Sequence, residues 1–283
     1  MKAKTILWTI VLLIASVIAH AQNQNKLIQT LYIKSGIDKQ VRQLPQLIRV
    51  NVLQAFEQDD RTKEIPRHTK LAISGSVQQA FSPDRFKQTI IKEVRASTTV
   101  KDLDTVLKWL DSPLGKKLTR LEEAASTPET LSKVKEFAAR LQQSPPTETR
   151  LNILRRLDAA VKATEANVEI VMNTQLAVAF AVVKSLPQEQ QGSLEAIAAE
   201  LKKNRPQVEA AMKSQTLIFS LYTYQNLTNA ELERYIRFAT SPAGEKYHRA
   251  TLSGFKKAFL DGSIKWGNSI ADILNHSARQ SET

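Results

Sequence analysis

Residues 99–118 read TVKDLDTVLKWLDSPLGKKL, and residues 228–247 read TNAELERYIRFATSPAGEKY. In both stretches apolar residues recur at steps of three and four, which is the spacing of one face of an α-helix. A Ser-Pro pair then interrupts the pattern, because the residue before a proline is disfavoured in the α region. Proline is tolerated at the first position of a helix. Each stretch therefore predicts one helix that ends at Ser-Pro and a second helix that begins there.

The two stretches agree at the positions that would build this helix–helix corner. A threonine three residues before an acidic residue is typical of a helix start, where both side chains cap backbone N–H groups. The serine is expected to cap the following helix, and the glycine to let another helix approach closely. The candidate motif residues are Thr99, Asp102, Trp109, Ser112, Pro113, Gly115 and Lys117 in the first copy, and Thr228, Glu231, Phe238, Ser241, Pro242, Gly244 and Lys246 in the second. We interpret them as structural, because a serine nucleophile needs a base and an oxyanion hole that the sequence does not place.

The repeated motif resembles the hallmark of an exported bacterial family, domain of unknown function 2059. Its pattern is a Glu-Leu pair, an aromatic residue, Ser-Pro, any residue, Gly and Lys. Residues 103–118 and 232–247 look like two copies of this pattern. In both copies the aromatic residue lies further from Ser-Pro than it often does in the family. The resemblance implies a helical, exported protein and carries no catalytic residues across.

The helical pattern extends over most of the chain, and strict alternation over a strand length is hard to find. Only 8 of the 283 residues are glycine, fewer than a turn-rich all-β protein would need. We therefore predict an all-α fold of two homologous multi-helix units, packed as a helical bundle or array. The units would span residues 22–143 and 147–275, divided at Ser144-Pro145-Pro146. Ser82-Pro83 and Thr127-Pro128 predict further capped helix starts.

Residues 1–21 have the features of a secretory signal peptide. Lys2 and Lys4 precede an apolar run over residues 6–19, and Ala19-His20-Ala21 supplies small residues where a signal peptidase cleaves. The alternative is a membrane anchor, but a spanning helix needs about 20 apolar residues and this run is shorter. We therefore expect cleavage and a periplasmic location without a transmembrane anchor.

The sequence lacks the usual signatures of catalytic and cofactor sites. The absence of cysteine excludes disulfides, thiol nucleophiles and Cys-ligated metals. The histidines beyond residue 21 are His68, His248 and His276, and no two have zinc-ligand spacing on one helix. There is no Gly-rich phosphate loop, and the adjacent pair Glu122-Glu123 would face different directions on a helix. We predict no catalytic residues, no metal and no cofactor.

The charge and the aromatic residues suggest a binding function instead. The formal net charge is +12, which would attract anionic lipids or polymers, although basic residues often only solvate helix faces. Nucleic acid is not expected, since no recognised motif accompanies the charge. Aromatic residues gather in the last quarter of the chain and could line a groove between the units. The candidate groove residues are Tyr235, Phe255 and Phe259, with Lys256 and Lys257 at the rim.

These observations favour a non-enzymatic, exported helical protein that binds an envelope protein or an anionic or apolar envelope ligand. The alternative function is an envelope hydrolase acting on peptidoglycan or lipid. A purely structural spacer is a third possibility. The sequence leaves the partner, the process and the oligomeric state open.

Overall fold

The computed structural model describes residues 22–58, 60–185 and 193–281, so the expected signal peptide lies outside the described residues. This part of the chain is all-α and contains no strand, as the sequence predicts. A helix over residues 22–34 comes first. The following elements are α2 (Ile37–Gln58), the 3-10 helix η1 (Asp60–Thr62), α3 (Arg67–Ala80), α4 (Pro83–Ser97), α5 (Val100–Asp111), α6 (Pro113–Ala125), α7 (Thr130–Leu141), α8 (Glu148–Val161), α9 (Ala163–Ser185), α10 (Leu194–Thr223), α11 (Asn229–Ala239) and α12 (Pro242–Ser281).

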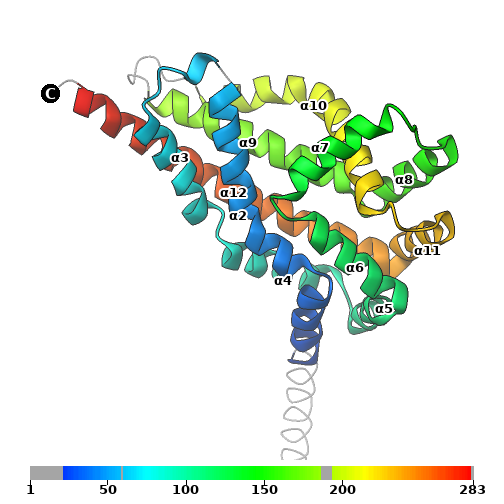
Figure 1. Cartoon of the computed structure of the whole chain (residues 1–283). Helices are drawn as coiled ribbons and strands as arrows, with labels where there is room; N and C mark the ends of the chain where they lie inside the picture. The colour runs from blue at the N-terminus through cyan, green and yellow to red at the C-terminus, as the bar shows by residue number, and fades with distance from the viewer. Residues whose placement is uncertain (1–21, 59, 186–192, 282–283) are drawn as a thin grey trace, which may run out of the picture.

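The apolar faces of these helices form two buried clusters. One is built around α12 and the helices packed on it, and includes Val77 of α3 and Trp266 of α12. The other lies among α6, α8, α10 and α11, and includes Leu118 of α6 and Leu232 of α11. In Figure 1, α5, α6, α8 and α11 gather at one end of the molecule. Each cluster joins residues from both predicted units, so the two halves of the chain share their core.

Helix α12 holds the larger cluster together. It is 40 residues long and packs against α3, α4, α5 and α9 (Figure 1). Trp266 is 1% exposed, and its indole Nε1 donates a hydrogen bond to the Ile73 carbonyl of α3 at 3.2 Å. At Gly254 a Cβ atom would lie 2.6 Å from the Ile90 Cα of α4, so only glycine allows this approach. The second half of the chain is thereby fixed to the first.

Two of the four predicted Ser-Pro or Thr-Pro caps differ from expectation. Helix α4 begins at Pro83, but the Ser82 side chain makes no capping hydrogen bond. Helix α7 begins only at Thr130, after Glu129, and Thr127 pairs with the Thr130 hydroxyl at 3.2 Å instead. A side-chain cap needs a favourable local backbone, and a Ser-Pro or Thr-Pro pair alone does not guarantee one.

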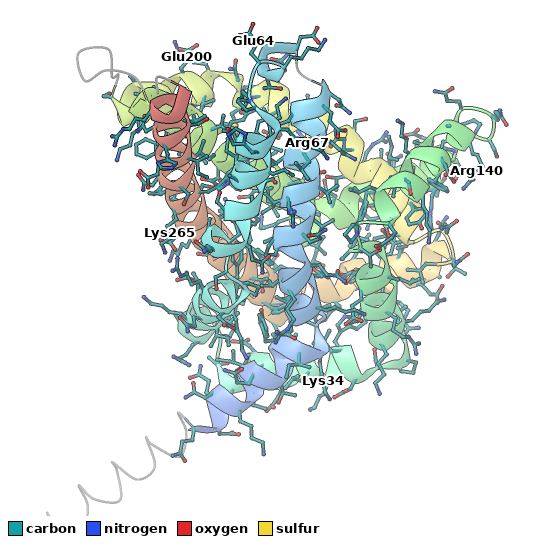
Figure 2. The ribbon with its side chains drawn as sticks, turned by 60° about the vertical axis from the view of Figure 1, so that its left-hand side comes forward. Lys34, Glu64, Arg67, Arg140, Glu200 and Lys265 are labelled. Carbon is teal, nitrogen blue, oxygen red and sulfur yellow. The ribbon has the colours of Figure 1, made fainter. Side chains whose placement is uncertain are left out.

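Charged side chains cover the outside of the helices. Lys34, Arg140 and Lys265 illustrate this in Figure 2. Many of the cations are paired, as in the ion pair of 2.6 Å between Lys34 and Asp111. Within the described ranges we find no helix that is both long and apolar enough to cross a bilayer.

Candidate binding site

The Ser-Pro-x-Gly motif builds the same corner twice. Ser112 Oγ donates to the Trp109 carbonyl at 2.6 Å and accepts from the Gly115 N–H at 3.0 Å. In the second motif Ser241 Oγ donates to the Phe238 carbonyl at 2.6 Å and accepts from the N–H of Gly244 at 3.2 Å. One hydroxyl thus ends one helix and begins the next.

Both helices that enter these corners start with a capping box. The Asp102 N–H donates to Thr99 Oγ1 at 3.2 Å, and the Thr99 N–H donates to Asp102 Oδ2 at 2.9 Å. The corresponding distances between Thr228 and Glu231 are 3.2 and 2.7 Å. The carboxylates that we predicted to be structural are therefore occupied by cap hydrogen bonds.

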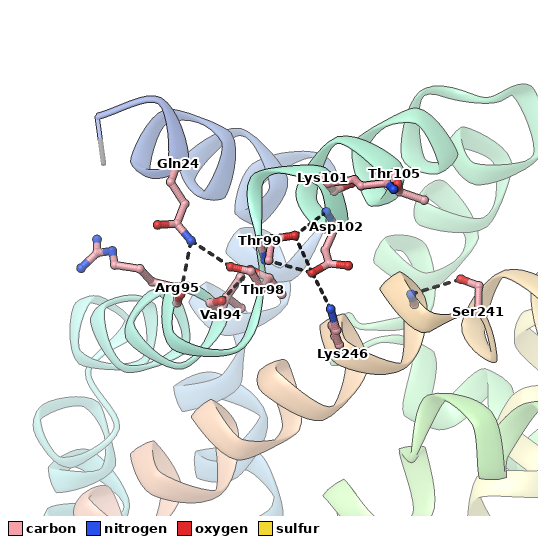
Figure 3. A network of polar contacts seen from close by, with 11 residues as sticks. Gln24, Val94, Arg95, Thr98, Thr99, Lys101, Asp102, Thr105, Ser241 and Lys246 are labelled. Carbon is pink, nitrogen blue, oxygen red and sulfur yellow. Dashed lines mark hydrogen bonds and ion pairs between the residues drawn. The ribbon is translucent and has the colours of Figure 1, made fainter. Parts of the chain in front are cut away.

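The lysine of each motif reaches the capping carboxylate of the other. Lys246 Nζ lies 2.8 Å from Asp102 Oδ2 (Figure 3), and Lys117 Nζ lies 2.8 Å from Glu231 Oε1. Between them the rings of Trp109 and Phe238 stack, with centroids 4.5 Å apart and planes at 8°. Such a reciprocal arrangement is that of an isologous interface, in which each half offers the same patch. We call these six residues, Asp102, Trp109, Lys117, Glu231, Phe238 and Lys246, the clasp.

The clasp holds its carboxylates in the ionised form. A hydrogen bond from Lys117, followed by the backbone N–H of Thr228, lowers the pKa of Glu231 to about 2. Burial alone would raise the pKa of Asp102, but hydrogen bonds from Lys246 and Thr99 together outweigh it and lower the pKa. Both groups therefore stabilise the fold when they are charged.

Acid should weaken the clasp within a defined pH window. Because the folded pKa of Glu231 is about 2 and its ordinary value is 4.5, its contribution is complete above pH 4.5 and is lost as the pH falls toward 2. Glu231→Gln should lower the free energy of unfolding by about 1 kcal/mol at pH 7 and by almost nothing at pH 2. Urea unfolding at a series of pH values measures this.

Glu200→Gln is the matched control for this prediction, because Glu200 lies in an exposed pair with Lys203 on α10, outside the clasp. It should leave the stability nearly unchanged throughout. A Glu231→Gln effect of equal size at pH 7 and pH 2 would show that the charge of Glu231 does not contribute.

A cavity of about 340 Å³ lies beside the clasp, and we call it the polar cavity. Its wall includes both stacked rings, and residues of α2, α5, α6, α8, α9, α10, α11 and α12 contribute to it. Glu122 Oε1 accepts hydrogen bonds from the Tyr224 hydroxyl at 2.8 Å and the Tyr235 hydroxyl at 3.1 Å. These groups come from both halves of the chain, so the cavity exists only when the halves are packed together.

Burial sets the protonation of the groups in this wall. It raises the pKa of Glu122 above its ordinary value and holds those of Tyr224 and Tyr235 well above theirs. It lowers the pKa of His248 to about 4, so the imidazole is neutral near pH 7. His248 Nε2 and the hydroxyls of Thr223 and Thr251 are buried without a hydrogen-bond partner. The wall therefore offers unused hydrogen-bonding atoms and no cation.

A second cavity of about 310 Å³ adjoins the first, and we call it the apolar cavity. The two share the lining residues Gln40, Ser126, Ala166, Asn167, Phe219 and Phe255. Leu44 and Leu47 of α2, Leu131 of α7, and Leu252 and Phe259 of α12 provide much of its wall. Both volumes fall in the range of small-molecule sites, about 300–1,000 Å³.

The structure brings together four of the five predicted groove residues. Tyr235 lines the polar cavity, Phe255 lines both, and Phe259 and Lys256 line the apolar cavity. Lys257 lines neither cavity; its ammonium lies 2.7 Å from Glu93 of α4. Neighbouring residues on a helix point about 100° apart, so Lys256 and Lys257 could not share one rim.

Sequence reasoning missed the polar residues of the site. Glu122 faces inward while Glu123 pairs with Lys39 outside at 3.2 Å, so only one of the two adjacent carboxylates belongs to it. The only signal was a polar residue on an otherwise apolar helix face. Among the residues that the structure describes, no group of three or more His, Asp and Glu side chains could hold a metal ion.

A wider surface groove of about 760 Å³ lies between α8, α9 and α10. Its charged groups have partners within the chain: Lys213 pairs with Glu209 at 2.9 Å, and Thr164 donates to Asp158 at 2.6 Å. Because these charges already have partners within the chain, the polar and apolar cavities are the better candidate site for a ligand.

Residues 84–143 match the model of a bacterial family described as "Uncharacterized protein conserved in bacteria (DUF2059)". This match confirms the resemblance that the first motif indicated. The matched range contains the corner at Ser112 and extends through α7. The second motif lies outside the matched range, although its corner has the same hydrogen bonds. Comparisons with curated proteins and with solved structures gave no significant match.

Proposed function

We propose that this protein is an exported, periplasmic binding protein without enzymatic activity, which holds an apolar envelope ligand in the polar and apolar cavities. The observation that carries the proposal is the pair of adjoining cavities between the two halves of the chain. Aromatic and leucine side chains line them, and buried polar atoms without partners face the polar one. Sites for small molecules commonly combine a largely apolar wall with a few polar groups.

The energetics favour an apolar ligand. Transfer of apolar surface from water into such a wall is worth about 25 cal/mol per Å². The net charge of +12 adds long-range attraction toward anionic envelope surfaces, where such ligands are found. The features of a signal peptide in residues 1–21 support the periplasmic part of the proposal.

Native mass spectrometry of the protein, purified gently from its own envelope, tests the proposal directly. We expect a retained molecule of small mass that organic solvent extracts. An environment-sensitive dye such as N-phenyl-1-naphthylamine should bind the emptied protein and be displaced by the extract. Failure of the folded protein both to retain a molecule and to bind the dye would overturn the proposal.

Blocking the junction of the cavities should abolish binding. Ala166 of α9 lines both cavities, so Ala166→Phe places a ring where they meet. We expect dye affinity to fall about tenfold or more while helix content is retained. Ala124→Phe is the matched control, because Ala124 is exposed on α6 and lines neither cavity. Equal loss in both variants, or no loss in Ala166→Phe, would show that the dye binds elsewhere.

A further inference from the structure

We infer that the ligand is an amphiphile with an uncharged hydroxyl head group, which occupies the polar cavity while its hydrocarbon chain occupies the apolar cavity. This inference rests on the proposed function and specifies the chemical class of its ligand. It follows from what the wall of the polar cavity offers and from what that wall lacks.

The wall offers three buried atoms that need hydrogen-bond partners, and Thr251 Oγ1 of α12 is one of them. Thr223 is 6% exposed, and its Oγ1 has no partner within the chain. His248 Nε2 is likewise buried without one, and both residues line the polar cavity. A hydroxyl can donate to an imidazole nitrogen, and it can donate to or accept from a threonine hydroxyl. Each such hydrogen bond would remove the penalty of leaving a buried polar atom unsatisfied.

The wall lacks a cation for an anionic head group. The titratable side chains that line the polar cavity are Glu122, His248, Tyr224, Tyr235 and Tyr247, and none of them is a lysine or an arginine. A carboxylate or phosphate would be desolvated beside the Glu122 carboxyl with no opposite charge to compensate it. Lys256 borders only the apolar cavity, and it is paired with Glu165 at 2.5 Å and with Glu169 at 3.6 Å.

The wall also lacks a suitable partner for a cationic head group. Glu122 is the acidic group in this wall, and its Oε1 already accepts from the hydroxyls of Tyr224 and Tyr235. Burial raises the pKa of Glu122, which disfavours the charged form that an ammonium would need as its partner. An uncharged head group therefore fits the polar cavity better than an ion of either sign.

The apolar cavity offers the hydrocarbon chain a continuation from the polar cavity. The two cavities meet at Ala166, Phe219 and Phe255, and beyond them Leu44, Leu47 and Phe259 line the apolar cavity. A head group held at His248 or Thr223 would thus direct its chain between α2, α9 and α12.

The test compares three ligands with the same chain and different head groups: n-dodecanol, dodecanoate and dodecylammonium, each below its aggregation concentration. Binding to the emptied protein is followed by displacement of N-phenyl-1-naphthylamine and by the fluorescence of Trp109, which lines the polar cavity. We expect n-dodecanol to bind at least about tenfold more tightly than either ion. Mass spectrometry of the retained molecule then shows whether a glyceride or a simple long-chain alcohol supplies the hydroxyl.

Variants separate the head-group contacts from the chain contacts. Thr223→Val and His248→Phe should each weaken n-dodecanol binding by about tenfold more than they weaken dye binding. Ser263→Ala is the matched control: its hydroxyl is also buried without a partner on α12, but it lines neither cavity. It should leave the affinity for n-dodecanol unchanged.

The outcomes distinguish the inference from the proposed function. Tighter binding of dodecanoate or dodecylammonium, or equal binding of all three ligands, would overturn the hydroxyl head group while the binding function stands. The same holds if Thr223→Val, which replaces the hydroxyl with a methyl group of similar size, leaves n-dodecanol affinity unchanged. If neither the dye nor any of the three ligands binds, both fail.

Discussion

Gly244→Ala is expected to lower the free energy of unfolding by about 3 kcal/mol. A Cβ atom on Gly244 would lie 2.1 Å from the Phe238 carbonyl oxygen, far inside van der Waals contact. That oxygen also accepts the hydrogen bond from Ser241, so it cannot move without breaking the corner. Urea unfolding followed by circular dichroism measures the change.

The first motif offers an independent repeat of this experiment. A Cβ atom on Gly115 would lie 2.1 Å from the Trp109 carbonyl oxygen, so Gly115→Ala should have an effect of similar size. Gly75→Ala is the matched control, since a Cβ atom there would meet nothing within 4 Å in the middle of α3. It should stabilise the protein by about 0.5–1 kcal/mol. Equal effects at Gly75 and Gly244 would contradict the geometric requirement for glycine at the corner.

Trp266→Ala should lower the free energy of unfolding by about 4 kcal/mol, the larger of the two effects. The side chain is almost fully buried, and its ring meets Phe81 edge to face at a centroid distance of 6.1 Å. Truncation would leave a cavity between α12 and α3 and would deprive the Ile73 carbonyl of the indole N–H.

Thermal and urea unfolding of Trp266→Ala measure this loss. Ile264→Ala on the same helix is the control, because Ile264 is 42% exposed and should lose less than about 1 kcal/mol. Trp266→Phe should fall between the two, because it keeps most of the apolar contact but not the N–H. A loss at Trp266 no larger than that at Ile264 would show that the larger cluster does not depend on this side chain.

The sequence predicted the features that depend on residues close together in the chain. Each capped helix start and each corner depends on residues three positions apart, as at Thr99, Thr228, Ser112 and Ser241. The spacing of hydrophobic residues was enough to predict an all-α fold. The same rule was wrong for Thr127, where the chain makes a turn before α7 begins.

The contacts that define the site join residues far apart in the chain, and local sequence patterns do not predict such contacts. Lys246 meets Asp102 across 144 positions, and Tyr235 meets Glu122 across 113. The repeat showed that each motif carries one lysine and one carboxylate, but not that each lysine pairs with the other motif. The partners of Glu122 and the burial of His248 depend on how the two halves pack.

The position of α12 has a consequence for the order in which the chain can fold. Residues of α3 and α4 such as Val77 and Ile90 are buried in the cluster that α12 completes, yet α12 is the final helix that the structure describes. During synthesis the N-terminal segments emerge first, and their apolar faces must wait for residues 242–281 before they can be covered. Under the proposed export, this delay would keep the nascent polypeptide from completing its native bundle before it passes through a narrow translocation channel, and folding would follow on the far side of the membrane.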